Sequence, residues 1–177
     1  MGEEQMGIGL SIFLGVVGSF VASILFLAFA SIFRPKLSIS KNIAVWEEED
    51  GTTYYSVKVV NCGYYSAINI TAEFSIIGLR KVQGGLGKRI YDIDLKKNNL
   101  LVLRPYDKKD PRDCTYEFLT RKNLPKIWED KPDAKLFFRV FAQHSFTSFS
   151  KLFEQKYDNQ KVFIKGRFGF GDSMDIK

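Results

Sequence analysis

A run of residues without a single charged side chain, from Ile8 to Phe33, constrains this 177-residue chain more than any other feature. At a rise of about 1.5 Å per residue, a helix over residues 8–33 is roughly 39 Å long and spans a hydrocarbon core of about 30 Å. A core helix in a small soluble domain would show a polar face, and this run shows none. The sequence therefore predicts a transmembrane helix at 8–33, between a short tail (1–7) and a domain (34–177).

The cations next to this helix stand on one side only. No Lys or Arg precedes the helix, whereas Arg34, Lys36 and Lys41 follow it closely. By the positive-inside rule, we expect a single-pass protein of the cell (inner) membrane with its N-terminus outside and its C-terminal domain in the cytosol. The three cations would then lie among the lipid head groups.

A cleaved signal peptide is the alternative for the N-terminal segment. The small-x-small pattern Ala28-Phe29-Ala30 resembles a cleavage site, and its use would make residues 34–177 a secreted or extracellular adhesion-type domain. However, the chain begins without a positive n-region, and its apolar run exceeds the roughly 7 to 15 residues of a signal peptide. The membrane helix is therefore the favoured interpretation.

Small side chains recur every four residues within the apolar run, at Ser11, Gly15, Ser19 and Ser23. Such a stripe allows two helix backbones to approach closely. The pattern predicts a homo-oligomer or contact with a partner membrane protein, although Gly, Ala and Ser are also common in membrane helices in general.

The remaining residues alternate between apolar and polar with a period of two, which is typical of strands. No long amphipathic helix interrupts them, and only Leu124 to Trp128 favours a helical turn. The pattern predicts a mainly-β domain, an antiparallel immunoglobulin-like β-sandwich, with a small β-barrel as the alternative. The expected strands are 37–46, 54–61, 67–77, 89–95, 100–104, 115–119, 135–143, 149–157 and 162–170.

One short stretch adds a family resemblance. The segment Val57-Lys58-Val59-Val60-Asn61-Cys62-Gly63, followed by Ala67 and an alternating strand to Ile76, resembles the strand, turn and strand of bacterial CARDB-like modules. The resemblance implies an immunoglobulin-type binding or spacer domain without catalytic residues. Those modules usually lie outside the cell, so a cytosolic placement departs from the family pattern.

The sequence offers little material for catalysis or metal binding. His144 is the single histidine, and no nucleophile motif surrounds it. Two cysteines and one histidine at unrelated spacings do not make a zinc site, and Asp92 and Asp94 stand among lysines and arginines that would pair with them. We therefore expect a protein that is not an enzyme and that holds no metal or cofactor.

Positive charge is concentrated in one part of the domain. Residues 80–126 hold thirteen Lys or Arg against six acids, mostly as doublets that we expect at turns. Such a surface would suit an anionic lipid or a nucleotide, with nucleic acid a less suitable partner, or it would serve only solubility. The candidate ligand-binding residues are Lys88, Arg89, Lys96, Lys97, Arg104, Lys108, Lys109, Arg112, Arg121 and Lys122.

These features suggest a membrane-anchored binding module whose β domain binds a protein or an anionic ligand. The alternative is a bacterial stress or antiviral membrane effector, in which a nucleotide on the basic domain drives helix oligomerisation and membrane disruption.

Overall fold

The computed structural model describes residues 2–129, 131 and 133–177 and divides into two units, a helical segment up to Arg34 and a β domain from Pro35 to Lys177. The first unit is one continuous helix, α1 (Gly2–Ile32). Its window Gly9–Ala30 has a mean hydropathy of 2.5 and is long and apolar enough to cross a membrane. The expected N-terminal apolar helix is therefore confirmed.

The first of two five-stranded sheets is built around β3 (Thr53–Asn61). This strand pairs along one edge with β7 (Thr115–Thr120) and along the other with β1 (Leu37–Ile39) and β2 (Ile43–Glu47), always antiparallel. Beyond β2 lies β10 (Phe163–Lys165), which pairs in parallel. We call this sheet A.

The second sheet, sheet B, is built around the longest strand, β4 (Ala67–Val82). One edge of β4 pairs with β8 (Lys135–His144), which in turn pairs with β9 (Ser150–Tyr157). The other edge pairs first with β6 (Asn99–Leu103) and then with β5 (Gly85–Asp92). The short helix α2 (Leu124–Glu129) and the 3-10 turn η1 (Gln160–Val162) connect strands of the two sheets.

The two sheets enclose one hydrophobic core. Buried and more exposed residues alternate along β8 and from Ile70 to Phe74 in β4, as the sequence period predicts, whereas β3 is buried on both faces and β5 on neither. The rings of Phe118 on sheet A and Phe138 on sheet B meet at 5.6 Å between centroids. Phe74 packs edge-on against Phe138 within sheet B. These contacts across the layers confirm the predicted mainly-β domain and are consistent with a β-sandwich.

Several predicted strand limits were wrong. The predicted strand 37–46 is two strands, because the chain breaks at Ser40, whose hydroxyl accepts a hydrogen bond from the backbone N–H of Lys58. The predicted strand 162–170 keeps only the three residues of β10. The predicted strand 89–95 begins earlier, at Gly85, because it forms a hairpin with the distal half of β4.

A buried lysine holds the C-terminal segment (166–177) on the outer face of sheet A. Lys58 on β3 is only 2% exposed, and its Nζ donates hydrogen bonds to the carbonyls of Gly169 (2.6 Å) and Ser173 (2.8 Å). Its cross-strand neighbour on β7 is Glu117. Burial lowers the pKa of Lys58 and raises that of Glu117, and the attraction between the two opposes both shifts.

We expect Lys58→Met to destabilise the β domain by about 2–4 kcal/mol, because it leaves two carbonyls without their charged donor and Glu117 without its countercharge. Urea unfolding of the full chain in detergent, followed by tryptophan fluorescence, measures the change. The exposed Lys161 provides the control, since Lys161→Met should stay within about 0.5 kcal/mol of wild type. Equal stability of the two variants would contradict the anchoring role of Lys58.

Candidate functional site

Aromatic and cationic side chains form a row across one end of sheet A. Trp46 on β2 and Tyr54 on β3 are cross-strand partners, and their rings stack at 5.8 Å with an interplanar angle of 16°. The guanidinium of Arg167 lies over Trp46 at 5.3 Å, and that of Arg121 lies over Tyr54 at 5.1 Å. The register explains the row, because Arg121 follows the residue of β7 that pairs with Tyr55.

Two cations share the ring of Tyr54. Arg121 also donates hydrogen bonds to the Tyr54 hydroxyl from Nε (3.0 Å) and Nη2 (2.6 Å), which fix the direction of its guanidinium. Lys96 places its Nζ 5.9 Å from the centre of the same ring. The loop that carries Lys96 is tied to β7 by a backbone hydrogen bond to Leu119. The two cations therefore converge from segments far apart in the sequence.

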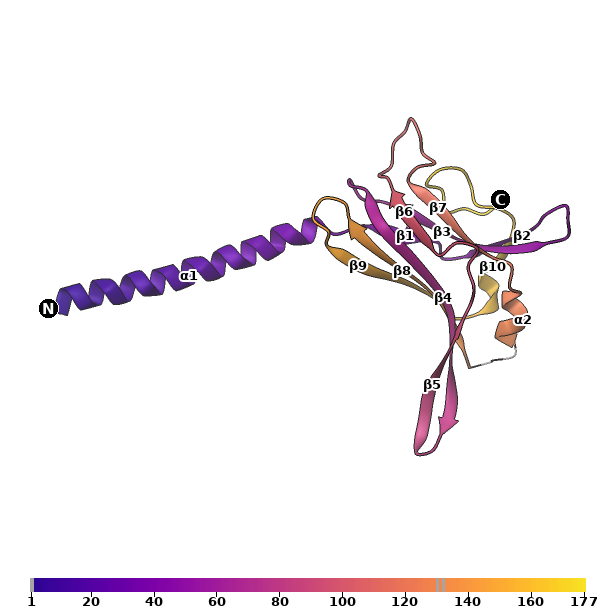
Figure 1. The fold of residues 1–177 in the computed structure, drawn as a ribbon, viewed down its shortest axis with the longest axis horizontal. Helices are drawn as coiled ribbons and strands as arrows, with labels where there is room; N and C mark the ends of the chain where they lie inside the picture. Colours follow the sequence, from indigo (N-terminus) through magenta and orange to yellow (C-terminus); the bar gives the residue numbers. More distant parts are fainter. Residues whose placement is uncertain (1, 130, 132) are drawn as a thin grey trace. The chain divides into compact units, whose positions relative to one another are not determined.

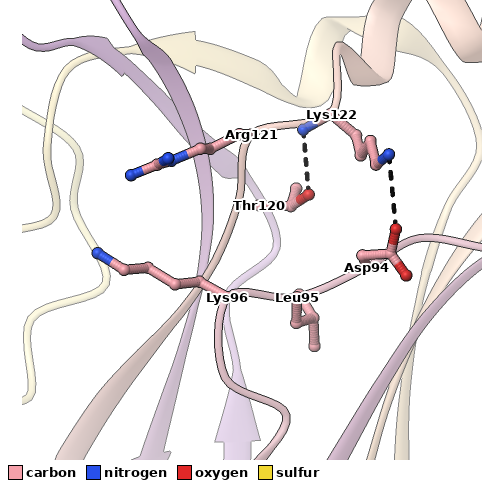
Figure 2. A pocket seen from close by; sticks show the side chains of 6 residues that line it. All are labelled: Asp94, Leu95, Lys96, Thr120, Arg121 and Lys122. Atoms are coloured by element: carbon pink, nitrogen blue, oxygen red, sulfur yellow. Dashed lines mark hydrogen bonds and ion pairs between the residues drawn. The ribbon is translucent and has the colours of Figure 1, made fainter.

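A hollow of about 520 Å³ lies beside this pair and is lined by Asp94, Leu95, Lys96, Thr120, Arg121 and Lys122. Figure 2 shows the side chains of Lys96 and Arg121 extending to the same side, away from an ion pair between Lys122 and Asp94. That pair spans 3.5 Å, and the backbone N–H of Lys122 donates to the Thr120 hydroxyl. Asp94 thus neutralises Lys122 and leaves the other two cations facing the hollow.

The other predicted cations do not join this cluster. In the loop after β6, Arg104 pairs with Asp113 at 3.2 Å and Arg112 pairs with Asp110 at 3.0 Å. The exposed residues Lys108 and Lys109 lie in the same loop, and Lys97 follows Lys96. The doublet Lys88-Arg89 lies in β5 and not at a turn, whereas the doublets at 96–97, 108–109 and 121–122 lie in loops between elements. The predicted basic surface is therefore divided into separate clusters.

The residues predicted to meet lipid or another helix are placed as follows. Lys36 and Lys41 are exposed at the start of the β domain, and Arg34 is exposed where the helical unit ends. The predicted small-residue stripe, which includes Gly15, lies within α1, where the Ser23 hydroxyl donates to the Ser19 carbonyl at 2.9 Å. Self-association through Ser11, Gly15, Ser19 and Ser23 stays a prediction.

The groups considered for catalysis or metal binding are placed as follows. His144 is 2% exposed, and its Nδ1 accepts hydrogen bonds from the backbone N–H groups of Phe146 (3.4 Å) and Thr147 (3.3 Å). Asp92 ends β5, whereas Asp94 lies beyond it, so the two do not share a strand. Among the described residues, no group of three or more His, Cys, Asp or Glu is placed to hold a metal ion.

Sequence reasoning missed the aromatic half of the site. Trp46 ends the predicted strand 37–46 and Tyr54 begins the predicted strand 54–61, and a hairpin register alone would have paired them. Arg167 could not have been found this way, because β10 reaches β2 from more than one hundred residues away.

Comparison with known proteins identifies no matching family model and no similar curated protein. The molecule is therefore described by its class, a β-sandwich domain that follows an apolar helix.

Burial gives His144 a definite influence on stability at acid pH. Because burial lowers its pKa below the unfolded value of about 6.5, the unfolded chain takes up the proton more readily. The stability contributed by the neutral ring is complete above that value and is lost as the pH falls below it. We expect wild type to lose more stability between about pH 7.5 and about pH 5.5 than His144→Asn, whose Oδ1 can still accept from the turn.

Urea unfolding of both proteins across this range measures the difference. Other titrating groups such as Glu117 are common to both, so the gap between the two profiles isolates the histidine. Parallel profiles would contradict a buried neutral His144.

Proposed function

We propose that this protein is a membrane-anchored, non-enzymatic binding module whose β domain binds a phosphorylated anion, such as a nucleotide, at Lys96 and Arg121. The helix α1 anchors the module as a single-pass protein of the inner membrane, with the β domain in the cytosol. The length and apolar composition of α1, and the cations Arg34, Lys36 and Lys41 that follow it, support this placement.

The observation that carries the proposal is that two positively charged side chains, Lys96 and Arg121, lie beside the ring of Tyr54. Among the described part of the chain, no carboxylate lies within ion-pair distance of Lys96 or Arg121, whereas Lys122, Arg104 and Arg112 each have one. Two nearby cations repel each other, and an anion between them relieves that repulsion. The binding free energy then includes an interaction that the empty site lacks.

The chemistry of the two cations suits a phosphate group. The guanidinium is a planar donor that binds two oxygens at once, and the lysine adds a mobile point charge. Because Tyr54 already holds Arg121, little side-chain entropy is lost when the anion binds. The hollow of about 520 Å³ is within the usual range for small-molecule sites, so a ligand of nucleotide size fits its volume.

The helix provides the second part of the proposal. With Ser11, Gly15, Ser19 and Ser23 on one face, α1 is suited to pack against another copy of itself or against a partner helix. Binding on the β domain and assembly in the membrane would then be two activities of one chain.

Anion binding is tested on the full chain in detergent by calorimetric titration with pyrophosphate and ATP. We expect Arg121→Gln and Lys96→Gln each to weaken binding by about tenfold or more, since a hydrogen bond to a charged group contributes about 1.5–3 kcal/mol. Added salt should weaken the wild-type interaction as well. The matched control is Lys161→Gln, which removes an exposed cation elsewhere. Equal affinities of all four proteins, or no binding by wild type, would refute the proposed site.

Membrane orientation is tested through Cys62, which is exposed, whereas Cys114 is buried. A membrane-impermeant maleimide should label Cys62 only after the cells are permeabilised. Partial burial and the nearby Asp172 raise the pKa of this thiol, so labelling is best done at mildly alkaline pH. The Cys62→Ser variant gives the background, and labelling of intact cells would place the β domain outside.

A further inference from the structure

The distal halves of β4 and β5 form a two-stranded arm that extends beyond the body of the β domain (Figure 1). The neighbouring strand β8 pairs with β4 only as far as Ile77, and β5 continues to pair with β4 as far as the turn between Val82 and Gly85. Within the described residues, no third strand therefore pairs with residues 79–90. A two-stranded ribbon has no core of its own and is marginally stable in water.

One face of this arm carries exposed aliphatic side chains together with two lysines. The cross-strand pairs Leu79↔Lys88 and Lys81↔Leu86 place both leucines and both lysines on the same face, where Ile90 follows opposite Ile77. Leu79, Leu86 and Ile90 are 59%, 66% and 55% exposed. Three large aliphatic side chains gathered on a free ribbon are unusual for a surface that meets only water.

The same arm carries basic side chains and no acidic ones. Residues 79–90 contain Arg80, Lys81, Lys88 and Arg89 and no acid. All four cations are exposed, and within the described residues none of them forms an ion pair. Arg89 instead lies over the ring of Tyr91 at 4.7 Å, at the base of the arm. Aliphatic side chains and cations are thus interleaved along a projecting element.

We propose that the β4–β5 arm is a lipid-docking element, which lays its Leu79, Leu86 and Ile90 face on an anionic bilayer surface. The transfer of aliphatic side chains from water to the acyl boundary of the bilayer has a favourable free energy, and the flanking cations are attracted by anionic head groups. Charge argues against a second copy of the arm as the occupant, because two arms with four cations each repel. Aliphatic side chains also argue against nucleic acid, since they neither stack on bases nor donate hydrogen bonds.

This inference shares the membrane anchor with the proposed function but does not depend on the anion site. The test uses the full chain with Cys62→Ser, which removes the exposed thiol, and with Leu86→Cys labelled by the environment-sensitive dye NBD. The labelled protein is reconstituted into vesicles of phosphatidylcholine alone or with phosphatidylglycerol. Flotation of the protein with the vesicles reports membrane anchoring by α1. Quenching of NBD by doxyl-labelled lipid reports contact between the arm and the bilayer.

We expect a blue shift and doxyl quenching in the anionic vesicles and much less of both in the neutral ones. Each substitution of Lys81 or Lys88 by Gln should lower the docking equilibrium by about fivefold. A label at Lys161→Cys serves as the control, because that exposed residue lies outside the arm. The Arg121→Gln background should leave the signal unchanged, which separates this test from that of anion binding.

Three outcomes would overturn the proposal. The first is an absence of doxyl quenching at residue 86 in anionic vesicles that float with the protein. The second is equal quenching in neutral vesicles or at the control label. The third is a blue shift in detergent without lipid that grows with protein concentration, which would identify a second copy of the chain as the occupant.

Discussion

The β domain depends on a central strand that is covered on both faces. The inner face of β3 packs in the core through Val57 and Val59, and its outer face is covered by the C-terminal segment through the buried ammonium of Lys58. A buried cation is costly unless its donors are satisfied, so the carbonyls of Gly169 and Ser173 are part of the fold. Near the start of the same strand lies Tyr54, the tyrosine that both cations of the candidate site contact.

The candidate site follows from that arrangement. Because β3 is fixed on both faces, Tyr54 presents its ring and hydroxyl in one direction, and Arg121 and Lys96 both orient on it. The net charge of the domain alone would not locate this site. In the loop after β6, Arg104 and Arg112 are paired with Asp113 and Asp110, and exposed pairs of that kind contribute little to stability. Lys96 and Arg121 share the ring of Tyr54, line one hollow and, among the described residues, have no carboxylate within ion-pair distance.

Local patterns in the sequence predicted the helix and strands whose formation depends mainly on neighbouring residues. The uncharged run predicted α1, and the period-two alternation predicted β3 and β8 nearly to the residue and the start of β4. Features that depend on contacts between distant segments of the chain were not predicted from the sequence. The burial of Lys58 was not predicted, because nothing local indicates that residues 166–177 cover it. The β4–β5 arm was missed as well, since residues 78–88 lie between the predicted strands 67–77 and 89–95.

The arm and the anion site are successive in the chain but mechanically distinct. Between them stands Ile93, which is 5% exposed and whose N–H donates to the Phe74 carbonyl at 2.8 Å. Buried side chains of this kind resist displacement, because moving one opens a cavity in a close-packed core. Ile93 thus provides a fixed point between residues 79–90 and Lys96. One short segment can therefore carry both the proposed lipid-docking arm and the proposed anion site, separated by a residue that is part of the core.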